Sequence, residues 1–168
     1  MPLARPRSFG YYIGLMKREA LDIEMITRVI QTGASASDEY FLDTETGEII
    51  LIPEEVLAAV ENDEIDSLRP SQRALVEKAA EIYKGNGRFV PIPHLSESDI
   101  FSVVSRLAEK LEDEELSDAI TKATAGPDFV DRFEEICLSR PEVMDMFYEL
   151  LDKHTAAFID KWLSELDI

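Results

Sequence analysis

The stretch that most constrains the fold is "DEYFLDTETGEIILIPEE", residues 38–55. Two runs rich in aromatic and β-branched residues, "YFLD" and "EIILI", flank the segment "DTETG". An Asp at the start and a Gly at the end of that segment favour a type I turn followed by Gly47 in the left-handed conformation. The sequence therefore predicts an antiparallel β-hairpin over about residues 39–52.

Carboxylates crowd this hairpin, and most of them have a local explanation. Asp43, at the first position of the turn, can accept hydrogen bonds from backbone amides, and Glu45 at the tip is expected to be solvated. Pro53 suits the first turn of a helix, where Glu54 and Glu55 are favourable against the helix dipole. Local chemistry therefore does not require a binding site here.

Helical patterns dominate the rest of the chain. Apolar residues recur at helical spacing over residues 17–31 and again over about 70–84. Ser96 and Asp99 form a capping-box pattern, and further helices are predicted from there over about residues 96–166. Between these regions, "RFVPIPHL" contains two prolines, which predicts an edge strand or an extended strap.

The order of these patterns predicts the fold class. We expect an α+β fold, predominantly helical, with a small antiparallel sheet in the N-terminal third followed by a C-terminal array of helices. A chain of 168 residues that is 45% hydrophobic suits one compact domain. We expect a basic and flexible N-terminal extension over residues 1–16, followed by a single domain over residues 17–168.

Neither a membrane span nor an oxidising compartment is indicated. No run approaches the roughly 18 apolar residues that a spanning helix needs. The start, "MPLARPRSFGYYIGLMKR", has no small-residue cleavage site behind its apolar run. The single cysteine, Cys137, cannot form an intramolecular disulfide. We therefore expect a cytoplasmic protein without a membrane partner.

The charge of the chain limits its partners. Acidic residues outnumber basic ones 35 to 17, for a net charge of −18, and the excess is present in both halves of the chain. Direct binding to nucleic acid is disfavoured, because neutralising phosphates requires clustered Lys and Arg. We expect a protein partner, with a basic protein as one candidate, while the oligomeric state stays open.

Motifs that would indicate catalysis, a cofactor or a metal are absent from the sequence. There is no Walker A loop, no G-x-G-x-x-G that follows a strand, and no G-x-S-x-G. Cys137 lies on an apolar helix face, and the two histidines, His94 and His154, are sixty residues apart. We therefore predict no catalytic residue, no cofactor and no metal ligand.

Five charged residues are the candidates for binding. The hairpin acids could bind a ligand if other groups converge on them. Basic residues are few in this chain, and each of two arginines could form either a structural ion pair or an anion-binding site. These candidates are Asp43, Glu45, Glu48, Arg88 and Arg132.

Five segments, in this order, resemble a bacterial family. They are "EYFLDTETGEIILI", "RFVPIPHLSESD", "LEDEELSDAI", "GPDFVDRFEEI" and "FYELLDKHTAAFIDKWL". Together they resemble uncharacterised protein family 0158, from about Leu21 to Leu166. The pair Phe147–Tyr148 departs from the Trp-aromatic pair expected there. The resemblance implies a bacterial, cytoplasmic protein, and it carries over no assigned activity or functional residue.

Three kinds of function follow as hypotheses. The first is a small acidic binding or regulatory protein that acts through protein–protein contact. The second is an enzyme or small-ligand-binding protein that uses the hairpin carboxylates with an arginine. The third is a nucleic-acid mimic that binds a basic protein. We expect the first, because each residue that could be catalytic is explained at least as well by a structural role.

Overall fold

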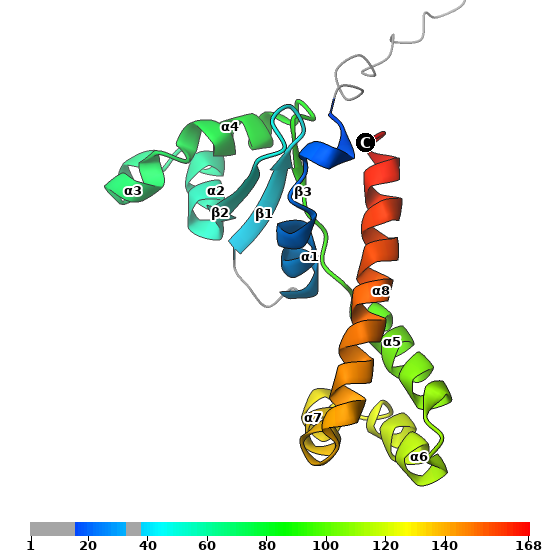
Figure 1. Ribbon diagram of the computed structural model, residues 1–168. Helices are drawn as coiled ribbons and strands as arrows, with labels where there is room; N and C mark the ends of the chain where they lie inside the picture. Colours follow the sequence, from blue (N-terminus) through cyan, green and yellow to red (C-terminus); the bar gives the residue numbers. More distant parts are fainter. Residues whose placement is uncertain (1–15, 33–37) are drawn as a thin grey trace, which may run out of the picture. The chain divides into compact units, whose positions relative to one another are not determined.

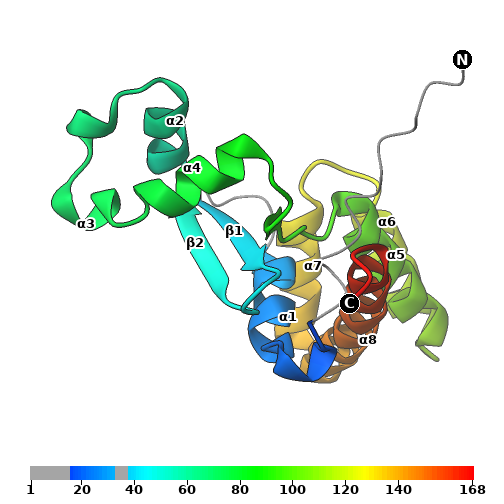
Figure 2. The same cartoon turned by 90° about the horizontal axis from the view of Figure 1, so that it is seen from above.

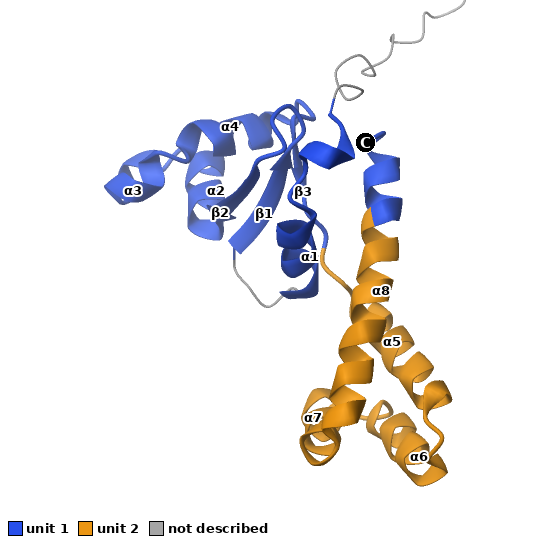
Figure 3. Ribbon diagram, viewed as in Figure 1, with its two compact units in different colours: residues 1–93, 160–168 blue, residues 94–159 orange. Residues whose placement is uncertain are grey.

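The contacts within the chain divide it into two compact units. The structure, a computed structural model, describes residues 16–32 and 38–168. One unit comprises residues 1–93 and 160–168, and the other comprises residues 94–159 (Figure 3). The predicted extension over residues 1–16 lies, apart from Met16, outside the described residues. That residues 17–168 form a single domain stays a prediction.

The first unit combines a small sheet with short helices (Figure 1). A 3-10 turn, η2, and the helix α1 come before the sheet. The elements in chain order are η2 (Arg18–Ala20), α1 (Ile23–Thr32), β1 (Asp38–Asp43), β2 (Ile49–Pro53), α2 (Glu54–Glu61), η3 (Ile65–Ser67), α3 (Pro70–Arg73), α4 (Val76–Lys84) and β3 (Phe89–Pro91).

The predicted hairpin is confirmed, and it forms two strands of a three-stranded antiparallel sheet. The strand order is β2-β1-β3, with Phe41 opposite Ile50 on one side and opposite Pro91 on the other. The proline segment therefore supplies an edge strand, as predicted. Both views draw α2 and α4 on one side of the sheet and α1 on the other (Figures 1 and 2).

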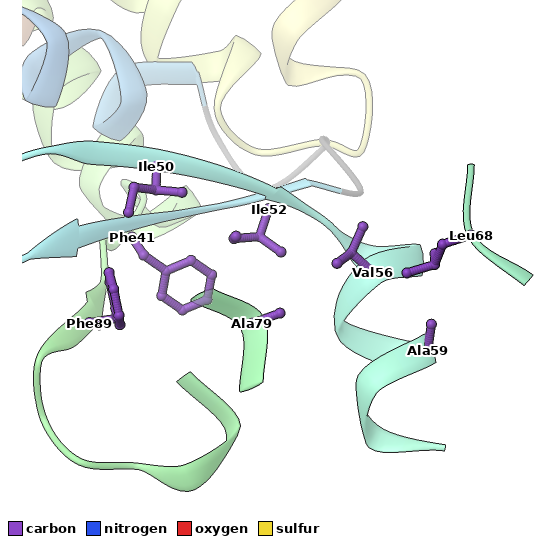
Figure 4. Close-up of a cluster of buried hydrophobic side chains, with 8 residues drawn as sticks. All are labelled: Phe41, Ile50, Ile52, Val56, Ala59, Leu68, Ala79 and Phe89. Atoms are coloured by element: carbon purple, nitrogen blue, oxygen red, sulfur yellow. The ribbon is translucent and has the colours of Figure 1, made fainter. Parts of the chain in front are cut away.

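Alternation along the strands builds the core between the sheet and α2 and α4. Phe41 and Ile52 point toward Ala79 of α4 and Val56 of α2 (Figure 4). Successive side chains of a strand point to opposite faces, and Leu42, the neighbour of Phe41, is also fully buried. Both faces of the central strand are therefore covered.

Two of the expected helices are shorter than the sequence pattern predicted. The helix expected from residue 17 begins at Ile23, because the Oδ1 atom of Asp22 accepts a hydrogen bond from the Met25 N–H at 2.9 Å and caps it there. The helix expected over residues 70–84 is interrupted after Arg73, whose Nε donates to the carbonyl of Leu68 at 3.1 Å. The later start of α1 depends on a side-chain contact that hydrophobic periodicity does not report.

The second unit is built from helices alone among its described residues. They are α5 (Glu97–Lys110), α6 (Glu114–Ala123), α7 (Phe129–Ser139) and the first part of α8 (Pro141–Glu165). The predicted capping box is confirmed, since Ser96 and Asp99 exchange hydrogen bonds at the start of α5. The α+β class, mostly helical with the sheet in the N-terminal third, is therefore as predicted.

Candidate functional site

The hairpin turn fixes the position of the Asp43 carboxylate. The N–H of Gly47 donates to the Asp43 carbonyl at 2.7 Å, and the N–H of Glu45 donates to the Asp43 Oδ1 at 2.9 Å. Gly47 has a φ of 77°, the left-handed conformation that the turn sequence predicted. A Cβ atom on Gly47 would lie 3.3 Å from the carbonyl oxygen of Ala20, so that close approach also favours glycine.

Arg88 binds this carboxylate from the neighbouring strand. Residue Phe89 pairs with Asp43 across β3 and β1, which brings Arg88 alongside the turn. Its Nε donates to the Asp43 Oδ1 at 3.1 Å and its Nη2 donates to the Oδ2 at 2.8 Å. Its backbone carbonyl accepts from both the N–H and the hydroxyl of Thr44, each at 2.8 Å. The sheet edge and the turn are thereby joined through one residue.

The ion pair holds Asp43 in its charged form. Burial alone would raise the pKa of Asp43, but hydrogen bonds from Arg88, the Glu45 N–H and Thr46 outweigh it and lower that pKa below its ordinary value. The same pair raises the pKa of Arg88. Neither group is therefore prepared to exchange a proton near neutral pH, as a general acid or base would be.

The other hairpin acids have partners of their own. Glu45 is exposed at the turn tip, as expected, and in addition its Oε2 lies 3.3 Å from the Arg88 Nε. Glu81 of α4 lies 3.6 Å from the Arg88 Nη1, and Glu48 pairs with Lys78 at 3.2 Å. Arg88 is thus surrounded by three carboxylates, which disfavours an additional anion there.

Arg132 belongs to the other unit. It lies on α7, and its Nη2 is 3.9 Å from the Asp128 Oδ2. Its Nη1 is also close to Gly126, where a Cβ atom would come within 3.3 Å. The structure therefore brings Asp43, Glu45 and Arg88 together, and pairs Glu48 and Arg132 with other residues.

A groove on the second unit is a different kind of candidate site. Its volume is about 630 Å³. One wall is the start of α5, with Ile100 and Phe101, and the other is the connection from α6 together with the start of α7, with Phe129 and Val130. Phe101 is 51% exposed and Val130 is 60% exposed, although both side chains are large and apolar.

A second hollow lies beside the groove along α5. That hollow has a volume of about 250 Å³ and lies between α5 and α6. Phe101 and Thr124 line both spaces, so the two are neighbours along α5, and together they are called the channel below. Among the described residues that line them, the charged side chains are those of Glu97 and Glu109. The result is an apolar channel with a carboxylate toward each end of α5.

Three of the hydroxyl groups that line this channel are already hydrogen-bonded to the backbone. The Ser117 hydroxyl donates to the Ala108 carbonyl at 2.8 Å, and that of Thr121 donates to the Ser117 carbonyl at 2.9 Å. The Thr124 hydroxyl donates to the Thr121 carbonyl at 2.6 Å. Because their protons are used within the unit, these groups add little donor capacity to the channel, which leaves its character mainly apolar.

Sequence reasoning missed this channel. Ile100, Val103, Val104 and Leu107 mark the buried stripe of α5, whereas Phe101 lies beside that stripe. A large apolar residue off the stripe was the available signal, but single exposed apolar residues are common on protein surfaces. Only the packing of α6 and α7 shows that Phe101 and Val130 border the same space.

The structure adds three further observations about function. No group of three or more His, Cys, Asp or Glu within residues 16–32 and 38–168 is arranged to hold a metal ion. None of the helices in those ranges is both long and apolar enough to cross a bilayer. Burial, with a contribution from Glu134, raises the pKa of the Cys137 thiol, which disfavours its reactive thiolate form.

Comparison with known proteins adds no relative. No family model matches the sequence, and neither a curated protein nor a solved structure matches it. The resemblance to uncharacterised protein family 0158 therefore stays a prediction that rests on the five quoted segments.

Proposed function

We propose that this chain is a small acidic binding or regulatory protein of the bacterial cytoplasm that acts through contact with another protein. The observation that carries the proposal is the apolar channel along α5, where Phe101 and Val130 are more than half exposed. Exposed apolar surface that lines a hollow and has a polar rim is typical of protein interaction sites.

The openness of the channel favours a protein over a small molecule. A pocket for a small ligand buries most of that ligand and presents a few convergent polar groups. Here Phe101 and Val130 are more than half exposed to solvent, and the Ser117, Thr121 and Thr124 hydroxyls donate to the backbone. For such a surface, the free energy of binding comes mainly from burying Phe101 and Val130 against another apolar surface.

The charged groups around Arg88 are already paired with one another, which supports the proposal. Asp43 accepts two hydrogen bonds from Arg88, and Glu45 and Glu81 lie against the same guanidinium. A group with this many protein partners is a support for the turn rather than a free ligand for substrate. The alternative of an enzyme built on the hairpin acids therefore has less support.

Comparative capture from a native lysate tests this function. The tagged protein, its Phe101→Glu/Val130→Glu variant and a Leu138→Glu control would be compared by quantitative mass spectrometry. Leu138 is 82% exposed on α7 and does not line the channel, so the control places one negative charge elsewhere on the unit, against two in the double variant. Circular dichroism would verify that all three proteins have the same helix content.

The proposal predicts proteins retained by the wild type and by Leu138→Glu, and lost from the double variant. An identical set of proteins on all three baits would contradict it. A thermal shift with nucleotides or metabolites that is abolished by Asp43→Ala would instead favour the ligand-binding alternative.

A further inference from the structure

We infer that the α5 channel binds an amphipathic helix of a partner protein, about three turns long, with apolar residues on one face and Lys or Arg toward both ends. This inference rests on the proposed function and specifies the chemistry of the partner. The occupant is argued from the backbone of the channel walls, from its length and from its charge.

The walls of the channel favour a helix over an extended peptide. An extended peptide that adds to a protein usually pairs its backbone with an open sheet edge. Here the walls are α5, α6 and the start of α7, whose interior backbone groups are already hydrogen-bonded within the helices. The start of α5 is closed by the Ser96–Asp99 capping box. A helix, which satisfies its own backbone, needs only apolar side chains to fill such a channel.

The length of the channel sets the length of its occupant. Its lining runs along α5 from Glu97 to Glu109. At 1.5 Å per residue this segment is about 18 Å long, which matches about three turns of a bound helix. Side chains at spacings of three, four and seven residues would then reach Phe101 and the apolar residues on either side of it.

Charge determines which kind of helix is favoured. The charged side chains that line the channel are Glu97 and Glu109. The described unit around them, residues 94–159, contains sixteen acidic and six basic residues. A partner with Lys or Arg at both ends would gain from these carboxylates, whereas an acidic partner would be repelled. The surplus of negative charge also accelerates the approach of a basic partner at low salt.

A fluorescent synthetic peptide tests the inference on the full-length protein. The probe has about 16 residues of Ala, Leu and Lys, with Leu at helical spacing along one face and Lys at both ends. One control peptide has the same composition in scrambled order, and another has Glu in place of Lys. A third contains residues 1–15 of this chain, which include Arg5 and Arg7 and no acid.

Fluorescence anisotropy would measure the affinity of each peptide. We expect saturable binding of the helical Lys peptide and at least about tenfold weaker binding to Phe101→Ala, as for a central apolar contact. The variant Glu97→Lys/Glu109→Lys should bind the Lys peptide more weakly and the Glu peptide more tightly. The control Glu112→Lys/Glu135→Lys changes the net charge equally at exposed positions outside the lining, and should leave both affinities nearly unchanged.

Four results would overturn the inference. The first two are no saturable binding of the helical Lys peptide, and equal binding of the scrambled peptide. The third is an equal effect of the two charge-reversal variants on peptide affinity. The fourth is tighter binding of the 1–15 peptide than of the Lys peptide, which would assign the channel to a segment of the chain itself. Any of these four results would exclude a basic helix as the partner. If lysate capture still depends on Phe101 and Val130, the proposed protein-binding function would nevertheless stand. If capture is also independent of those residues, both proposals fail.

Discussion

Arg88 holds Asp43 through two roughly parallel hydrogen bonds, of 3.1 and 2.8 Å, between residues that are 45 positions apart in the sequence. The Asp43 side chain is almost completely buried, and that of Arg88 is about one-third exposed. This pair connects the hairpin turn to the start of β3. Its geometry makes it a structural element of the sheet, and the predictions below test that role first.

Removing the Asp43 charge should destabilise the first unit. Asp43→Asn is expected to lower the free energy of unfolding by about 2 kcal/mol, because a buried hydrogen-bonded carboxylate is lost while Arg88 keeps its charge. Urea denaturation followed by circular dichroism would measure the loss. Lys78→Ala, which removes the exposed pair with Glu48, serves as the control and should have little effect. Equal stability of Asp43→Asn and wild type would contradict the structural role.

The same pair predicts a dependence of stability on pH. The pKa of Asp43 in the folded protein is lowered below its ordinary value of 3.8. Its contribution is therefore fully present above pH 3.8 and is lost as the pH falls through the folded pKa. Protonation of other acids relieves repulsion at the same time, so wild type and Asp43→Asn must be compared at each pH. We expect the difference in unfolding free energy to shrink in acid, and a constant difference would refute the assignment.

Asp99 should contribute more to the stability of the second unit than a helix-capping residue alone would. Its Oδ2 accepts from the Ser96 N–H at 2.8 Å, and its Oδ1 lies 2.9 Å from the Nε2 of His154 on α8. Ser96→Ala removes only one side of the cap and should cost about 1 kcal/mol. Asp99→Ala should cost more, and a double-mutant cycle with His154→Ala should give a non-zero coupling energy. Additive effects of Asp99→Ala and His154→Ala would exclude the α5–α8 link.

The prediction of a single domain can be tested with two natural probes. Trp162 and Cys137 are the single Trp and Cys of the chain; both are buried, and they lie in different compact units. Denaturation followed by tryptophan fluorescence and by thiol labelling should give one common midpoint. Ile52→Ala and Leu107→Ala, one in each unit, should each lower stability by about 2–5 kcal/mol and shift both signals together. Two separate midpoints would show that the units unfold independently.

The local features of the fold could be predicted because each depends on a few adjacent residues. The turn at Gly47 and the cap at Ser96 are both local, and the structure has them as expected. The end of α4 at Gly85, with a φ of 66°, is of the same kind. Pro53 was expected in the first turn of a helix, and it instead ends β2 and lies at the N-cap of α2, one residue earlier.

The arrangement of the candidate sites is long-range, and the sequence pattern did not predict it. Both Asp43 and Arg88 were candidates, but their pairing depends on β3 adding to the sheet beside β1. The channel depends on how α6 and α7 lie against α5, which exposes Phe101 and Val130 in one place. Periodicity identifies the buried face of each helix separately, and it does not show which exposed residues of different helices share a surface.

Photocrosslinking in living cells is the most direct test of the central claim that this channel binds a protein. A benzophenone amino acid would replace Val130 in one variant and Leu138 in a matched control, since both residues are exposed on α7. The account predicts a protein adduct from position 130 that decreases in the Glu97→Lys/Glu109→Lys background, and little adduct from position 138. Absence of an adduct at position 130, or equal adducts at the two positions, would contradict it.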